Sequence, residues 1–404
     1  MDDPAQQRSI PKYLPQPEPE RRGLGLCLSG GGYRAALFHL GSMRRLNELG
    51  VLAKITDISS VSGGSILAAH LATVLDPWPE APIDDWDARV ADPFKRFTSN
   101  NIRTGPVLKR LLPWNWARTS TAVEALADLY ESKLTRLKVT ELPQHPRFVL
   151  CATDMSFGAN FVFERAFVGD YMAGYCPPPA EWLLARGVAA SSCFPPIFNP
   201  LPVGLDPVRL KGGRAPQGAE RDRLIKGLRL SDGGVYDNMA LEPLWKQSRT
   251  LLVSDGGAPF DFKPDSGLLW RLQRYTSIVS RQASGVRKRW LISNFLAGEL
   301  EGTYWGISSA TGSYDGTEGY SKDLARDVVA KIRTDLDRFS DAEKSVLENH
   351  GYTLADAAVR KHTAHLIDGD PVETAIPNLH YMEEARVRSE LADSHKLKLP
   401  FGRR

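Results

Sequence analysis

A glycine run, a serine among small residues and two Asp-Gly-Gly tripeptides are the features of this sequence that could do chemistry. The first, Ser29-Gly-Gly-Gly-Tyr-Arg-Ala35, lies between a short apolar run and an apolar pattern of helical spacing. Its glycines permit a tight turn, and successive N–H groups at the start of a helix bind anions. The anion could be a phosphate or the oxyanion of an acyl-transfer intermediate, with Arg34 adding positive charge. The spacing of a P-loop is missing, and a plain strand-to-helix turn is the alternative without a function.

The second feature, Ser60-Val-Ser-Gly-Gly64, has the small residues that a nucleophile elbow requires. In such an elbow, a sharp turn between a strand and a helix exposes a serine hydroxyl. Ser62 is therefore the candidate nucleophile, with Ser60 in the position of the usual first glycine. A serine at this place could instead cap the helix by accepting a hydrogen bond from a backbone N–H.

The third feature, Asp232-Gly-Gly-Val-Tyr-Asp-Asn238, offers a carboxylate at the end of a predicted strand. Such a carboxylate could accept the Ser62 proton as a general base. A second Asp-Gly-Gly occurs at Asp255, so the tripeptide is not specific in itself. Both could equally be turns in which the aspartate bonds to nearby backbone.

Alternating strand and helix patterns are needed to position these residues. Apolar helical spacing spans residues 35–52 and 66–74. A short apolar run at residues 24–28 indicates a buried strand, and further strands are expected at residues 55–61, 148–152, 228–230 and 251–253. Strand, glycine turn and helix in repetition predict an α/β fold with a mostly parallel sheet and helices on its faces.

Together the motifs resemble the patatin-like phospholipase family, among its bacterial lipid acyl hydrolases. The three signatures stand in the family's chain order, and Ala152–Gly158 and Ala189–Pro196 are also similar to family stretches. The resemblance covers residues 22–260. It implies a three-layer α/β/α sandwich and a Ser–Asp dyad without histidine. It also implies hydrolysis of phospholipid or lysophospholipid acyl esters with no metal and no cofactor.

Carried over by position, the resemblance makes Ser62 the nucleophile and Asp232 the base. Gly30, Gly31 and Gly32, with Arg34, become the oxyanion site. The Asp237-Asn238 continuation favours Asp232 over Asp255. The departure from the family pattern is Ser60, which concerns the geometry of the elbow more than its chemistry.

Composition fits a globular protein in a reducing compartment. The 404 residues are 42% hydrophobic and 25% charged, and the net charge of +3 is too small to indicate nucleic acid as a partner. The four cysteines form no Cys-x-x-Cys pair, and no signal peptide is apparent, which predicts a cytoplasmic location. We expect a Pro-rich mobile arm (1–22), a catalytic domain (23–260) and a helical C-terminal extension packed on it (261–404), with helices at 268–294 and 321–348. No feature of the sequence points to an oligomeric state.

Residues 93–123 contain basic, aromatic and leucine side chains and no acidic residue. This pattern suits peripheral contact with the inner face of an anionic membrane, but also a basic surface whose aromatics pack on the core. A second basic cluster, from Arg281 to Trp290, has the same two interpretations.

Two rival functions remain open. One is a catalytically weak lipid- or anion-binding regulator on the same fold. The other is a Ser-His-Asp esterase for small esters. The chain order required by that esterase could be met by late histidines, which we expect at the surface: His350, His362, His365, His380 and His395.

Overall fold

The computed structural model describes residues 21–112, 115, 120–260, 267–369, 372–397 and 402. Residues 1–20 of the expected arm lie outside this part of the chain. So do Trp114, Trp116 and Arg118 of the expected membrane segment.

In the described part of the chain, ten strands form one sheet in the order β10-β9-β1-β2-β3-β4-β5-β6, with β8 joined to β3 and β7 to β8. Its five strands from β10 to β3 run parallel, and the remaining pairs are antiparallel. The parallel strands are β1 (Leu24–Leu28), β2 (Ile55–Val61), β3 (Arg147–Asp154), β9 (Thr250–Asp255) and β10 (Glu301–Gly306). The others are β4 (Ala159–Phe163), β5 (Val168–Asp170), β6 (Gly174–Cys176), β7 (Leu201–Pro202) and β8 (Arg229–Asp232).

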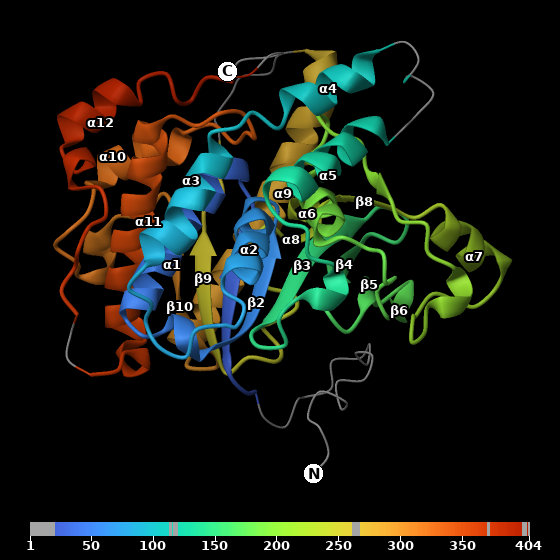
Figure 1. The fold of residues 1–404 in the computed structure, drawn as a ribbon, viewed down its shortest axis with the longest axis horizontal. Coiled ribbons are helices and arrows are strands. Elements are labelled where there is room, and N and C mark those ends of the chain that lie inside the picture. Colours follow the sequence, from blue (N-terminus) through green and yellow to red (C-terminus); the bar gives the residue numbers. More distant parts are fainter. Residues whose placement is uncertain are drawn as a thin grey trace.

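Helices cover both faces of the sheet, so the expected α/β architecture is confirmed (Figure 1). Strand alternation divides the core: Leu26 of β1 faces the larger apolar cluster, whereas Cys27 faces a second cluster that includes Leu291. The larger cluster lies under α1 (Gly32–Glu48), α2 (Gly63–Val74) and α11 (Asp341–His362), and the second under α9 (Leu268–Leu296). Shorter helices are α3 (Asp92–Thr98), α4 (Thr104–Leu111), α5 (Thr121–Lys133), α6 (Leu184–Ser192), α7 (Ala219–Lys226), α8 (Gly234–Asp237), α10 (Lys322–Asp327) and α12 (Glu384–Glu390).

Glycines let α11 approach α1 closely. A Cβ atom at Gly41 would lie 1.8 Å from the carbonyl oxygen of Glu348, and one at Gly351 would lie 1.8 Å from that of Phe38. Any larger residue would separate the two backbones. Helix α1 is therefore enclosed between the sheet and α11, which explains why even its Arg45 is fully buried.

The region beyond residue 260 is part of the same core. It contributes β10, which extends the parallel sheet beside β9, and this strand was not predicted from the sequence. The single helix expected at 321–348 is also wrong, because the chain is non-helical just before α11. Ser340 starts α11 with a capping box: its hydroxyl accepts from the Glu343 N–H at 3.2 Å, and the Glu343 carboxylate accepts from the Ser340 N–H at 2.8 Å.

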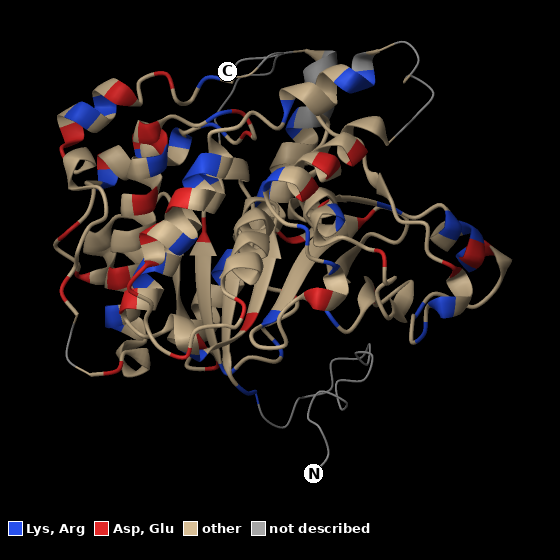
Figure 2. Ribbon diagram, viewed as in Figure 1, with Lys and Arg blue, Asp and Glu red and all other residues tan. Residues whose placement is uncertain are grey.

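Charges of both signs alternate over much of the molecule. Figure 2 shows them interspersed along α7, α11 and α12. Helix α7 lies in the segment between β7 and β8. Among the described residues, no helix is long and apolar enough to span a membrane.

Candidate active site

Ser62 lies at the turn between β2 and α2, where the sequence predicts a nucleophile elbow. Its φ of 51° and ψ of −116° fall in a region that residues with a side chain rarely adopt. Such strain costs about 1–3 kcal/mol and persists only where the surroundings enforce it. Ser191 supplies part of this support, because its hydroxyl accepts from the Ser62 N–H at 3.0 Å and donates to the Cys151 carbonyl at 2.6 Å.

The residues around Ser62 are small because the backbone there is crowded. A Cβ atom at Gly63 would lie 2.2 Å from the Gly32 carbonyl oxygen, and one at Gly64 would lie 2.2 Å from that of Leu28. The unusual Ser60 fits this turn. Its hydroxyl donates to the Val149 carbonyl at 3.3 Å, so the strand-to-helix turn forms without the usual first glycine.

Asp232 ends β8 and is held beside Ser62. Strand β8 pairs with β3 so that Asp232 lies opposite Ala152, and one carboxylate oxygen accepts from the Gly234 N–H at 2.7 Å. Burial raises the pKa of Asp232 to about 6, while the Gly234 N–H and a hydrogen bond from the Ser62 side chain oppose that rise. Ser62 and Asp232 are each only 5% exposed. The structure thus brings together the two residues that the motifs singled out.

The glycine loop lies against the elbow, at the N-termini of α1 and α2. A Cβ atom at Gly30 would lie 3.1 Å from the Cβ atom of Ser62. The Gly30 N–H donates to the Asn238 carbonyl at 3.0 Å, so it is not available to an oxyanion, contrary to the prediction. Among the described residues, the N–H groups of Gly31 and Gly32 have no hydrogen-bond acceptor. The positive ends of two helix dipoles also converge here.

Arg34 does not lie as the sequence suggested. Its guanidinium donates to the Gly256 carbonyl at 3.2 and 3.0 Å and to the Ile332 carbonyl at 2.8 Å. Burial, and to a lesser degree the charge of Arg281, lowers the pKa of Arg34 to about 10. This geometry makes Arg34 a clamp between α1 and two distant segments, and gives no support to a direct contact with an oxyanion.

Residues 332–339 form a brace that packs against the glycine loop. The Tyr33 N–H donates to the Asp335 carbonyl at 3.0 Å, and a Cβ atom at Gly32 would lie 2.6 Å from that same oxygen. The Asp335 carboxylate is paired with Arg103 at 2.6 Å, and both side chains are 1% exposed. Sequence reasoning missed this support, because nothing in residues 332–339 resembles a site motif.

The other candidate bases are engaged elsewhere. One oxygen of Asp255 accepts from the Gly257 N–H at 2.9 Å and the other from the Tyr304 hydroxyl at 2.7 Å. All eight histidines are in the described residues, and none is hydrogen bonded to Ser62 or Asp232. His350 is not at the surface as expected: it is buried in α11, and its Nε2 is bonded to the Ile307 carbonyl at 2.8 Å.

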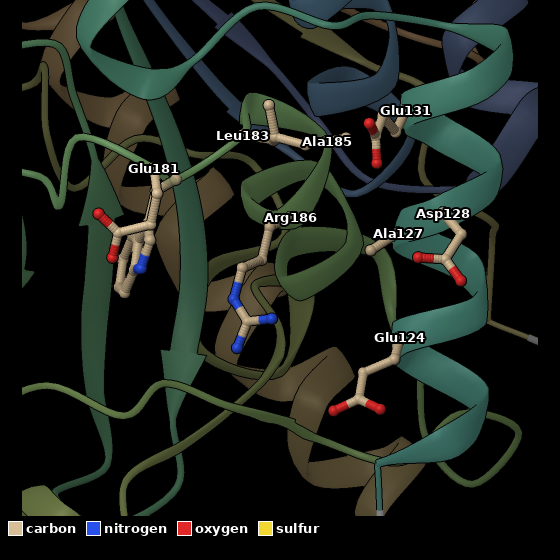
Figure 3. A pocket seen from close by; sticks show the side chains of 9 residues that line it. Glu124, Ala127, Asp128, Glu131, Glu181, Leu183, Ala185 and Arg186 are labelled. Carbon is tan, nitrogen blue, oxygen red and sulfur yellow. The ribbon is translucent and has the colours of Figure 1, made fainter.

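Among the described residues, neither the cavity between α5 and α6 nor a metal-binding cluster adds to the site at Ser62. A cavity of about 330 Å³ lies between α5 and α6 (Figure 3), but its lining does not include Ser62 or Asp232. Four of the nine lining residues carry a carboxylate: Glu124, Asp128, Glu131 and Glu181. Arg186 also lines the cavity. In the described part of the chain, no group of three or more His, Cys, Asp or Glu residues is placed to hold a metal ion.

The family model of the patatin-like phospholipases matches residues 26–245, which is more than half of the chain. The protein therefore belongs to the patatin-like phospholipase family. The match begins in β1 and ends after the Asp232 motif, so it contains every residue that the sequence assigned to the site. A comparison with curated proteins returns no match.

Solved structures show only distant similarity. Human GIVD cytosolic phospholipase A2 is 15% identical with a TM-score of 0.49, over 85% of this chain and 59% of that one. Its complex with methyl gamma-linolenyl fluorophosphonate is 16% identical with a TM-score of 0.49, over 85% and 58%. VipD from Legionella pneumophila is 14% identical with a TM-score of 0.35, over 85% and 67%. The chain thus spans less than two thirds of the human enzyme's length.

Proposed function

We propose that this protein hydrolyses fatty acyl esters of phospholipids or lysophospholipids, with Ser62 as nucleophile and Asp232 as base. The observation that carries the proposal is the strained Ser62 at a strand-to-helix turn, whose side chain stabilises the ionised form of the buried Asp232. Membership of the patatin-like phospholipase family supports the class of substrate. We also propose a cytoplasmic location.

In the proposed reaction, the Asp232 carboxylate accepts the Ser62 hydroxyl proton while the serine oxygen attacks the ester carbonyl carbon. The developing oxyanion lies near the Gly31 and Gly32 N–H groups and that of Gly63, the residue after the nucleophile. Asp232 then returns the proton to the leaving alcohol, which leaves an acyl-serine. A water molecule then attacks the acyl carbon and gives a proton to Asp232, which passes it to the Ser62 oxygen as the fatty acid is released.

The environment of Asp232 suits this role. A carboxylate in water is a weak base, and burial raises the pKa of Asp232 to about 6. The group therefore stays mostly ionised near neutral pH, yet binds a proton more readily than an exposed aspartate. The absence of a histidine bonded to Ser62 among the described residues disfavours the Ser-His-Asp esterase.

The expected membrane segment has fewer free charges than its sequence implies. Lys95 pairs with Glu348 at 2.5 Å and Arg103 with Asp335 at 2.6 Å, so acids from the C-terminal region neutralise two of its cations. Phe94 and Phe97 are buried in the core, as the packing interpretation expects. Membrane contact through residues 93–123 remains a proposal that rests on the exposed Arg96 and Lys109 and on the half-buried Arg110.

The test is covalent labelling and product analysis. A fluorophosphonate probe should label the wild type, and Ser62→Ala should lose both the label and the release of fatty acid from phospholipid, by at least about a thousandfold. Ser132→Ala, on the exposed side of α5, is the matched control and should behave as wild type. Retention of the label by Ser62→Ala would reject Ser62 as the nucleophile. A labelled protein that releases no fatty acid from any lipid would favour the regulator.

A further inference from the structure

Helix α9 is far more basic than the rest of the chain. Its 29 residues contain six Lys or Arg side chains and no Asp or Glu, whereas the whole protein carries a net charge of +3. The six cations are Arg271, Arg274, Arg281, Arg287, Lys288 and Arg289. Such a composition attracts an anionic partner.

The same helix carries an apolar stripe that is largely exposed. Tyr275, Val279, Val286 and Trp290 are 60%, 68%, 56% and 37% exposed. Successive members are separated by four, seven and four residues, so they lie along one side of the helix. The opposite side buries Leu291 in the second core cluster. Trp290, the least exposed member of the stripe, packs edge to face on Trp245 with 4.8 Å between the ring centroids, so Tyr275, Val279 and Val286 form the exposed part of the stripe.

Helix α9 also lies beside the candidate site. Arg287 donates to the Tyr236 carbonyl and lies 4.0 Å from a carboxylate oxygen of Asp237, both in the short helix α8. Helix α8 begins two residues after Asp232. A surface bound along α9 would therefore be close to the catalytic pair.

We infer that α9 docks on an anionic lipid surface, with its apolar stripe inserted among the headgroups. Basic side chains next to exposed aromatic and aliphatic ones are typical of helices that lie in a membrane interface. A nucleic acid or an acidic protein would satisfy the cations but would leave Val279 and Val286 without an apolar environment. The inference rests on the proposed function, because docking at this place would present lipid esters to Ser62.

The experiment measures sedimentation of the full chain with vesicles of phosphatidylcholine and phosphatidylglycerol, or of phosphatidylcholine alone. Val279→Asp/Val286→Asp places two acids in the stripe and changes the net charge by −2. Lys226→Glu, at an exposed position at the end of α7, makes the same change of net charge outside both proposed membrane segments and is the matched control. A short monomeric ester reports the catalytic pair separately from docking.

We expect the wild type to bind vesicles that contain phosphatidylglycerol more tightly than vesicles of phosphatidylcholine alone. The double α9 variant should bind the phosphatidylglycerol vesicles at least about tenfold more weakly than the wild type does. Its hydrolysis of the short ester should stay at the wild-type level, because both substituted valines are exposed. Equal loss in the α9 variant and Lys226→Glu would overturn the inference, as would binding to a DNA duplex or to polyglutamate but not to vesicles. If the wild type binds vesicles through α9 yet never cleaves the short ester, the proposed function fails and the docking surface stands.

Discussion

Asp232 must be ionised to act as a base, although its surroundings favour the neutral form. Burial is the largest influence and raises the pKa, while the Gly234 N–H at 2.7 Å and the Ser62 side chain stabilise the carboxylate. The balance, a pKa of about 6, places the change of protonation within the range of ordinary assays. Both the rate and the stability should therefore respond to it.

We predict that kcat/KM for a short ester rises as pH increases through about 6, because only the carboxylate accepts the Ser62 proton. Asp232→Asn should lose most activity at every pH. It should not be less stable near neutral pH, because a raised pKa means that ionisation of Asp232 destabilises the folded state there. The measurements are a pH–rate profile and thermal melting, with Asp255→Asn as the milder control. A rate that falls as pH rises through this range would be incompatible with Asp232 as the base.

Residue types singled out a candidate nucleophile and a candidate base that the structure places together, but not which donors face the site. Ser62 and Asp232 were identifiable because their chemistry and their glycine neighbours are local features of the sequence. Gly30 and Arg34 were misassigned, since the acceptors of their N–H groups are carbonyls of Asn238, Gly256 and Ile332. The last of these is about 300 residues away from Arg34, and no local pattern reports such a contact.

At the scale of elements, the glycine loop depends on a segment that is distant in sequence. Residues 332–339 place the Asp335 carbonyl against the loop, and the Arg103–Asp335 ion pair holds Asp335 itself. Both side chains are 1% exposed, so removal of one charge would leave the other buried without its partner. The brace should therefore be sensitive to single substitutions.

We expect Arg103→Gln to lower the free energy of unfolding by about 3–5 kcal/mol. Arg103→Gln/Asp335→Asn should lose less than the sum of the two single variants, because neither charge is then left alone. Urea unfolding of the four proteins measures this coupling. Arg326→Gln, which breaks an exposed pair with Asp327, is the control and should change little. Additive losses would mean that the pair does not hold the brace.

The elements near the motifs were easier to predict than those beyond them. β1 and β2 have the bounds expected, because each is a short segment with apolar residues that leads into a glycine-containing turn. β10 was missed because its sequence, Glu-Gly-Thr-Tyr-Trp-Gly, is polar at one end and has two glycines. Its pairing with β9, rather than its own composition, makes it a strand.

At the scale of the whole molecule, several carboxyl groups are buried in a way that favours their neutral form. Asp154 and Asp170 are fully buried, and one carboxyl oxygen of each has no hydrogen-bond partner among the described residues. Burial raises the pKa of both, and the charge of Asp154 raises that of Asp170 further. Two adjacent carboxyl groups cannot both ionise cheaply, so the pair retains one proton. Asp232 and Asp335, each with a pKa raised to about 6 by burial, act in the same direction.

These groups make the folded protein bind more protons than the unfolded chain over mildly acidic to neutral pH. The free energy of unfolding should therefore fall as pH rises. The contribution of Asp170 is fully present below about pH 4 and is lost as pH passes its folded pKa of about 8.

In Asp170→Asn, the amide oxygen can still accept from the Met172 and Ala173 N–H groups, both 2.8 Å from Asp170 Oδ1, and the amide nitrogen can donate to Asp154. This variant no longer titrates at position 170. Urea unfolding at several pH values between about 5 and 8 should give a shallower decline than in the wild type, although Asp232 and Asp335 keep it from vanishing. Asp206→Asn, at an exposed turn, should retain the wild-type slope. Equal slopes in Asp170→Asn and the wild type would show that the Asp154–Asp170 pair holds no proton in the folded state.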